Sequence, residues 1–230
     1  MPAKKNIHSG HRDRVRDRFT ADGLESFADH NILELILFYS VPRRDTNELA
    51  HRLLEHFGSI SAVLDASVER LTEVPGITYS TAVLLHLFPA VYKRYELSKY
   101  ASGTDLNNIN ALYNYVSGLF IGESEEALFA VCLDGQNRLI CSEKISSGSV
   151  NATAVSAGKI LDCALRNKAA SLVIAHNHPG SNAMPSGPDI YSTDSINKAL
   201  EAARIMLQDH IIVGGDGKIS SMRALGYIGY

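Results

Sequence analysis

The sequence lacks several features that mark membrane or secreted proteins. No run of eighteen apolar residues occurs, so we predict no membrane-spanning helix. The lysines near the start precede no apolar core, so we expect no signal peptide. There are only three cysteines, an odd number, which we expect to be buried, reduced thiols and not a disulfide framework: Cys132, Cys141 and Cys163. These absences predict a cytoplasmic protein with no membrane partner.

The sequence also lacks a surplus of basic residues. Residues 1–100 hold 13 Lys and Arg against 13 Asp and Glu, and the whole chain has a formal net charge of −3. Nucleic-acid-binding proteins usually show such a surplus, because phosphate neutralisation supplies most of their affinity. The one basic cluster, residues 10–19, alternates its arginines with Asp13 and Asp17. We interpret it as a solvated helix face, with a phosphate-binding arm as the alternative.

What is present is typical of a globular protein of one large or two small domains. Of the 230 residues, 45% are hydrophobic and 20% charged. Residues 1–96 show helical patterns, including a helix, a Pro-Gly turn at Pro75-Gly76 and a second helix. Residues 97–108 are rich in Ser, Gly, Asp and Asn, which predicts a linker. We therefore expect an all-α first domain over 1–96.

Residues 109–230 alternate between strand and helix patterns, which predicts an α/β or α+β domain around one mixed sheet. Apolar runs separated by turn residues predict the strands, and amphipathic stretches predict the helices. The predicted strands lie near 126–133, 138–145, 171–175, 210–213 and 219, and the predicted helices near 109–120, 152–167 and 189–206.

One short stretch carries the chemistry of this second half. Residues 171–175 are apolar after the first position and lead into His176 and His178, which the period of two in a strand puts on one side. Asp189 follows with ten residues between, and Ser186 lies three positions before it. Two imidazoles and a carboxylate suit Zn²⁺ and leave a fourth position for water, as in catalytic zinc sites. A histidine pair that merely caps a loop is the alternative.

The full spacing, His-x-His-Pro-x6-Ser-x2-Asp, resembles the signature of the JAMM (MPN-plus) metalloprotease family, in which a Glu precedes the histidines. The phrase His176-Asn-His-Pro, with Asp-His-Ile-Ile-Val-Gly-Gly at 209–215, resembles more specifically the bacterial RadC family. The resemblance implies a JAMM/MPN-like domain with a mixed sheet over 109–230. It also implies that the preceding all-α domain is helix-hairpin-helix-like.

The resemblance implies roles for further residues. In JAMM enzymes the Glu precedes the strand beside the metal, which matches Glu126 better than Glu125. Glu126 is thus expected to be the general base that activates a zinc-bound water and later protonates the leaving amine. The Ser186 hydroxyl is expected to donate to the oxyanion of the intermediate. A helix or loop cap ahead of Asp189 is the alternative role for this serine.

The sequence departs from the RadC pattern at two places. Where those hairpins usually read Gly-x-Gly, this one has Gly76-Ile-Thr78, and a threonine side chain obstructs the close approach of backbone to phosphate. We interpret the hairpin as a packing or partner-docking module. The loop after the histidines reads His178-Pro-Gly-Ser181 in place of His-Pro-Ser-Gly, which leaves the ligands in place and changes the loop.

The expected function is a zinc-dependent metallopeptidase that hydrolyses an amide or isopeptide bond of a peptide or protein. One alternative is a DNA-associated repair or recombination accessory protein in which the zinc domain is a scaffold; weak DNA association would then lie in the N-terminal domain. A metal-dependent nuclease is a second alternative, but such sites are usually richer in carboxylates.

A few polar residues stay open or are given no chemistry. We assign Asn177 to loop packing. Asp209 and His210 either support the metal ligands or cap a strand. The six histidines of the first half show no ligand spacing.

Overall fold

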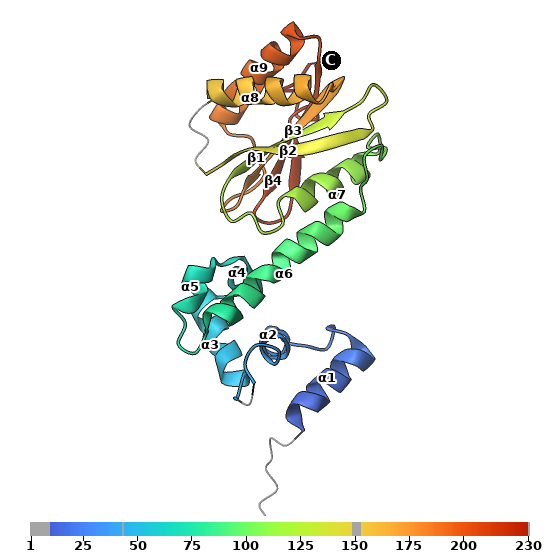
Figure 1. The fold of residues 1–230 in the computed structure, drawn as a ribbon. Coiled ribbons are helices and arrows are strands. Elements are labelled where there is room, and N and C mark those ends of the chain that lie inside the picture. The colour runs from blue at the N-terminus through green and yellow to red at the C-terminus, as the bar shows by residue number, and fades with distance from the viewer. Residues whose placement is uncertain (1–9, 43, 149–152, 230) are drawn as a thin grey trace, which may run out of the picture. The chain divides into compact units, whose positions relative to one another are not determined.

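The computed structural model describes residues 10–42, 44–148 and 153–229 (Figure 1). They form two compact units, one up to Pro89 and one from Ala90, and the division falls inside helix α6 (Tyr79–Ser98). The start of the chain, on which the prediction about a signal peptide depends, lies outside the described residues. Among the helices of the described part, none combines the length and apolarity needed to cross a bilayer.

The first unit is helical, as the sequence predicts. Its other helices are α1 (His11–Asp22), α2 (Asp29–Leu37), α3 (Asn47–Phe57), α4 (Ile60–Asp65) and α5 (Val68–Thr72). Apolar residues of α2 to α6 share one core, with Leu33, Leu53 and Leu85 fully buried. Helix α3 ends at Gly58, whose φ of 90° is a left-handed conformation that glycine adopts without strain.

The turn between α5 and α6 passes through Pro75 and Gly76, and Gly76 has a φ of 99°. Thr78 stands just before α6, and its hydroxyl accepts a hydrogen bond from the Thr81 N–H at 3.3 Å. Thr78 therefore occupies the position of a helix cap, which satisfies one of the free N–H groups of the first turn.

The second unit is a mixed sheet covered by helices. Its elements are α7 (Ile109–Leu119), β1 (Ala127–Leu133), β2 (Leu139–Ser147), α8 (Thr153–Arg166), β3 (Ser171–His178), α9 (Gly187–Ala202), β4 (Met206–Gly214) and β5 (Ile219–Ser221). The strand order is β2-β1-β3-β4-β5, and only β3 and β4 pair in parallel. Helices α8 and α9 cover one face and α7 covers the other (Figure 1). This confirms the predicted fold class.

Strand alternation decides which residues each face receives. On β1, Leu128 packs with the core under α8 and α9, whereas Phe129 packs with the core under α7. On β3, Ile174 faces α8 and α9, and Ala175 faces α7. Leu128 pairs with His176 in the antiparallel ladder. The even-numbered residues of both strands therefore face α8 and α9, and the odd-numbered residues face α7.

The segment 97–108, predicted as a linker, begins in the last turn of α6. Further along, it is hydrogen-bonded to the turn between β1 and β2 and to the start of β2. The Thr104 carbonyl accepts the Leu139 N–H at 2.8 Å, and the Leu106 N–H donates to the Asn137 carbonyl at 3.1 Å. The Leu106 side chain is buried in the core under α7. The domain limits drawn from the sequence stay predictions about where independently folding domains begin and end.

Candidate metal centre

The site lies where β3 runs from apolar residues into two histidines. Leu172 and Ile174 face α8 and α9, and strand alternation puts His176 and His178 on that same face. Helix α9 covers this face, and Asp189 lies in its first turn. The fold therefore brings residues from a strand end and a helix start to one place.

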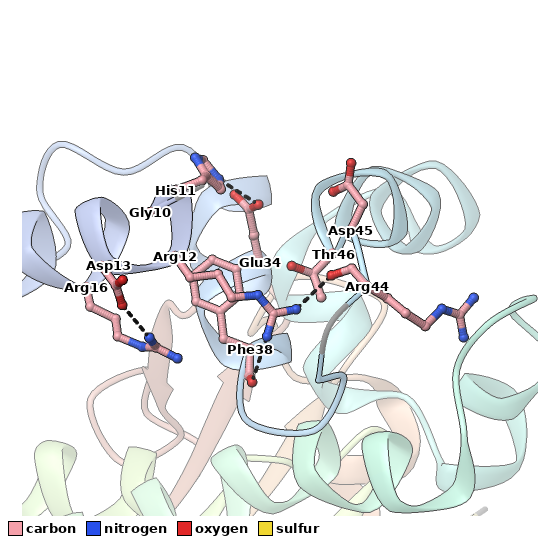
Figure 2. A pocket seen from close by; sticks show the side chains of 10 residues that line it. All are labelled: Gly10, His11, Arg12, Asp13, Arg16, Glu34, Phe38, Arg44, Asp45 and Thr46. Atoms are coloured by element: carbon pink, nitrogen blue, oxygen red, sulfur yellow. Dashed lines mark hydrogen bonds and ion pairs between the residues drawn. The ribbon is translucent and has the colours of Figure 1, made fainter. Parts of the chain in front are cut away.

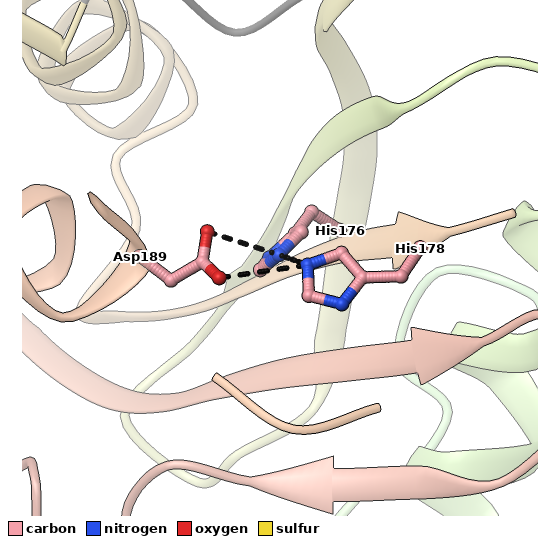
Figure 3. Close-up of side chains that lie close together, drawn as sticks. All are labelled: His176, His178 and Asp189. Atoms are coloured by element: carbon pink, nitrogen blue, oxygen red, sulfur yellow. Dashed lines mark hydrogen bonds and ion pairs between the residues drawn. The ribbon is translucent and has the colours of Figure 1, made fainter. Parts of the chain in front are cut away.

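Three side chains converge there, as Figure 3 shows. The Nε2 atoms of His176 and His178 are 2.9 Å apart. Asp189 places Oδ1 3.3 Å from His176 Nε2 and Oδ2 3.5 Å from His178 Nε2. His176 is buried, and the other two are half-buried. These are the three residues that the sequence predicts as metal ligands, and the structure brings them together.

The donor spacing fits a tetrahedral metal ion. Zinc–ligand bonds of about 2.0–2.1 Å at tetrahedral angles put neighbouring donors about 3.3 Å apart. The separations of 2.9, 3.3 and 3.5 Å lie near that value, the last two being to different oxygens of Asp189, and with one ligand atom from each residue all three atoms lie within 4.8 Å of one another. Two imidazoles and a carboxylate are donor types of catalytic zinc sites, which keep one position for water. The cluster could therefore hold a zinc ion.

The ring of His178 is fixed from its other nitrogen. Its Nδ1 lies 3.0 Å from the Asn182 carbonyl, which can only accept, so Nδ1 carries the proton and Nε2 presents a lone pair to the cluster. The loop that supplies this carbonyl packs tightly against Gly215, where a Cβ would collide with the Pro179 carbonyl. A pocket of about 340 Å³ lies in this loop, lined by Pro179, Gly180, Ser181, Asn182, Gly215 and Asp216.

The ring of His176 contacts a further histidine. His176 Nδ1 lies 2.7 Å from His210 Nε2, and His210 Nδ1 lies 2.6 Å from the Thr193 hydroxyl oxygen. His210 is buried on β4, and desolvation, followed by the nearby His176, holds its pKa well below the usual value. The sequence left two roles open for His210, support of a metal ligand or a strand cap. The structure shows its ring in contact with the predicted ligand His176.

Asp209, by contrast, points to the other face and supports the end of the chain. Its Oδ2 accepts the Ser221 hydroxyl at 2.5 Å. Its Oδ1 accepts the N–H groups of His210 and Arg223 at 2.7 and 3.0 Å. Asp209 is therefore buried with its carboxylate satisfied by β5 and the residues that follow it.

Ser186 caps α9. Its hydroxyl accepts the Asp189 N–H at 3.3 Å, while its N–H and O–H both donate to Asp189 Oδ2, at 2.7 and 2.6 Å. Burial alone would raise the pKa of Asp189, but the neighbouring His176 and the hydrogen bonds from Ser186 outweigh burial and hold the pKa well below the usual range. The cap role, left as the alternative for this serine, is present; the oxyanion role stays a prediction.

Glu126 lies just before β1 and is exposed. Continuing the register that pairs Leu128 with His176 puts Glu126 opposite His178, on the face of the cluster, and Glu125 on the other. Within the described residues, the converging group comprises only the two histidines and Asp189, so Glu126 lies outside it. Its role as base stays a prediction.

Asn177 fastens the segment that carries Glu126. Its Oδ1 accepts the Ala127 N–H at 2.7 Å, and its Nδ2 donates to the Glu125 carbonyl at 3.1 Å. Asn177 is itself buried, on the face opposite its histidine neighbours. The side chain assigned to loop packing thus ties β3, between two predicted ligands, to the approach to β1.

A second polar pocket, of about 500 Å³, lies in the first unit (Figure 2). Its buried carboxylate, Glu34, is 3.0 Å from His11 Nε2 and 3.4 Å from Asn47 Nδ2. The Arg12 guanidinium donates to backbone carbonyls, including that of Val41 at 2.7 Å. Glu34 and Arg12 are thus both hydrogen-bonded within the first unit, and we assign the pocket a structural role.

Sequence reasoning missed Thr193. It lies one helical turn after Asp189, and that i,i+4 spacing was the available signal. Its contact with His210 depends on how α9 and β4 meet, which no local pattern reveals.

Comparison with known proteins matches two family models to this chain. Residues 106–227 match the family model of the RadC-like JAB domain, and residues 8–83 match that of the UPF0758 N-terminal domain. A UPF0758 protein of Rhodobacter capsulatus is 36% identical over 214 residues, which is 93% of this chain and 100% of the relative. Another, from Ruegeria pomeroyi, is 35% identical over 95% of this chain and 97% of its own length.

Proposed function

This chain belongs to the RadC (UPF0758) family, and from that premise we propose that it is a zinc-dependent metallopeptidase that hydrolyses an amide or isopeptide bond. The observation that carries the proposal is the convergence of two imidazole nitrogens and a carboxylate, the donor types of catalytic zinc sites, with ligand atoms within 4.8 Å of one another. His176, His178 and Asp189 would hold the ion. When bound, zinc lowers the pKa of coordinated water to about 7, so that a nucleophile exists at neutral pH.

The residues of the chain would then move the proton and stabilise charge. Glu126, on the site face by register, would accept the proton of the attacking water and pass it to the leaving amine. Asn177 would hold the backbone next to Glu126 through the Ala127 N–H. The Ser186 hydroxyl, which donates to Asp189 Oδ2 in the described structure, would turn toward the oxyanion during reaction.

Three further statements belong to the proposal. The partner is a peptide or protein substrate. A cytoplasmic location is proposed from the small number of cysteines, of which Cys132 and Cys163 lie in the core as thiols 3.7 Å apart. DNA association through the N-terminal unit is proposed to be weak.

The test separates the base from the ligands. Glu126→Gln keeps size and hydrogen-bonding capacity but cannot accept the proton, so we expect zinc to stay bound and cleavage of a peptide or isopeptide library to fall about 10²–10⁴-fold. Asp189→Asn should instead weaken metal binding first, with activity lost as a consequence.

Glu125→Gln is the matched control, because register puts residue 125 on the opposite face, and it should cleave nearly as the natural chain does. Zinc loss in Glu126→Gln, or cleavage at the natural rate, would show that Glu126 is not the base.

A further inference from the structure

A chain of hydrogen bonds connects the predicted ligand His176 to the helix that supplies the predicted ligand Asp189. It runs from His176 Nδ1 to His210 Nε2 at 2.7 Å, and from His210 Nδ1 to Thr193 Oγ1 at 2.6 Å. It ends where Thr193 Oγ1 meets the Asp189 backbone carbonyl at 2.6 Å. The three side chains in this chain of hydrogen bonds, those of His176, His210 and Thr193, are all buried.

The carbonyl at the end of this chain fixes where the protons lie. A carbonyl has no proton, so at 2.6 Å the Thr193 hydroxyl must donate to it. A hydroxyl has one proton, so toward His210 Thr193 can only accept, and His210 Nδ1 must carry the proton. The Nε2 of a neutral His210 is then an acceptor, which requires His176 to carry its proton on Nδ1.

We infer that Thr193 and His210 are positioning residues that set the tautomer and orientation of His176, so that its Nε2 presents a lone pair to the metal position. The proposed function supplies the metal on which this inference rests. His178 reaches the same tautomer by a different route, through the Asn182 carbonyl. Each histidine ligand therefore has its second nitrogen occupied, and hydrogen bonds of this kind raise the metal affinity of ligating histidines.

The two routes differ in what they connect. The bond of His178 stays within four residues of its own loop. The chain from His176 crosses from β3 to β4 and returns to α9 at Asp189, so the residue that provides the carboxylate also anchors the ring of the neighbouring ligand. A shift of α9 would disturb both ligands at once.

The test uses the full chain and two measurements. In zinc-free protein prepared with a chelator, long-range ¹H–¹⁵N spectra of the imidazoles distinguish a proton on Nδ1 from one on Nε2. We expect His176 and His210 both to carry it on Nδ1. Zinc affinity, measured by competition with a chromogenic chelator, should fall about 10–100-fold in Thr193→Val and in His210→Phe.

Thr193→Ser keeps the hydroxyl and should retain the natural affinity and tautomers. Ile212→Val is the control for lost packing, because Ile212 is fully buried on the same face of β4 and should lower stability without lowering zinc affinity. A proton on Nε2 of either ring in the natural protein, or unchanged affinity in Thr193→Val, would overturn the inference. The tautomer measurement needs no metal and no substrate, so it gives an answer even if the protein cleaves no peptide.

Discussion

The two units of this chain differ in where they bury polar side chains. In the first, the buried polar residues among those described are Glu34 and Thr46, which line one pocket, and Thr81 near the start of α6. In the second, His176, Thr193 and His210 form one hydrogen-bonded group, whereas Ser171, Asn177, Asp209 and Ser221 lie elsewhere on the same sheet. Burying a polar group is costly unless it is hydrogen-bonded, so a gathered set needs a local reason.

That reason lies in the topology of the second unit. Strands β3 and β4 are its one parallel pair, and α9 connects them. Ligand sites in such units form where a parallel strand ends and the next helix begins. The helix start also favours a carboxylate there, as at Asp189. The first unit has no strand among its described residues, and its buried Glu34 connects α2 to α1 and α3 through His11 and Asn47.

The largest effect should come from removing the proposed metal, because the one cluster that could hold a metal among the described residues lies in the second unit. We expect purified protein to hold about one zinc per chain and the double variant His176→Ala, His178→Ala to hold none. Free zinc a thousandfold above its Kd would stabilise the bound form by about 4 kcal/mol. Metal analysis and hydrogen exchange should show faster exchange in β3, α9 and β4 after chelation, with α2 and α3 unchanged.

Leu53→Ala is the converse control. It empties a fully buried position in the first unit and should destabilise by about 2–5 kcal/mol, with faster exchange in α2 and α3 and full zinc content. Full zinc retention in the double histidine variant would contradict the assignment of the zinc site to the second unit.

Much of this contrast was available from the sequence. The apolar patterns of both halves gave the helices and strands, because each element must bury one face. The spacing from His176 to Asp189 indicated the ligand set, since a strand period and a helix start determine where those side chains lie. Local patterns therefore predicted the three residues that converge at the candidate metal centre.

The rest depended on contacts between elements distant in sequence. His210 could support a ligand or cap a strand, and only the pairing of β4 with β3 places its ring beside His176. Thr193 gave no signal beyond its spacing from Asp189. Asn177 was assigned to loop packing because its side chain lies on the strand face opposite the histidines. Its three contacts reach about fifty residues back to the approach to β1, which no local pattern reveals.

A smaller effect should come from an ion pair of the second unit outside the site. Glu123 accepts hydrogen bonds from Lys93 and Lys144 at 2.7 and 2.6 Å. Burial alone would raise the pKa of Glu123, but these two lysines outweigh burial and hold the pKa below its usual value. Glu123→Gln should therefore destabilise the protein by about 1 kcal/mol at pH 7.

The sign of the pH dependence follows from the lowered pKa. A carboxylate with a depressed pKa in the folded state stabilises above its unfolded pKa of about 4.3, and this stabilisation is lost as the pH falls through the folded value. Urea unfolding at pH 7 and pH 3 should thus show a difference between Glu123→Gln and the natural chain that shrinks in acid. The exposed pair Asp194–Lys198 offers a control, and Asp194→Asn should change stability less. An equal difference at both pH values would contradict the assignment.

The smallest effect should be the response of the chain to duplex DNA, because Arg12, Arg16 and Arg52 of the first unit are bonded within the protein. Arg12 donates to the carbonyls of Val41 and Arg44, both at 2.7 Å, and Figure 2 shows the bond to Arg44. Arg16 pairs with Asp13 at 3.0 Å. A guanidinium whose donors are satisfied within the protein gains little from a phosphate.

Polar groups at the hairpin around Pro75 and Gly76 are also bonded within the protein. Arg52 donates to the Pro75 carbonyl at 2.9 Å and pairs with Glu48, and the Thr78 hydroxyl caps α6. We therefore expect the full chain to bind random duplex at physiological salt more weakly than about 1 μM, the tight end of non-specific binding, with a shallow salt dependence. Thr78→Gly restores the second hairpin glycine and tests whether that side chain alone blocks phosphate. Because Arg52 and Glu48 remain paired beside the turn, fluorescence anisotropy should show no tightening in this variant. Submicromolar binding by the natural chain, falling steeply with salt, would instead make the first unit a DNA-binding module.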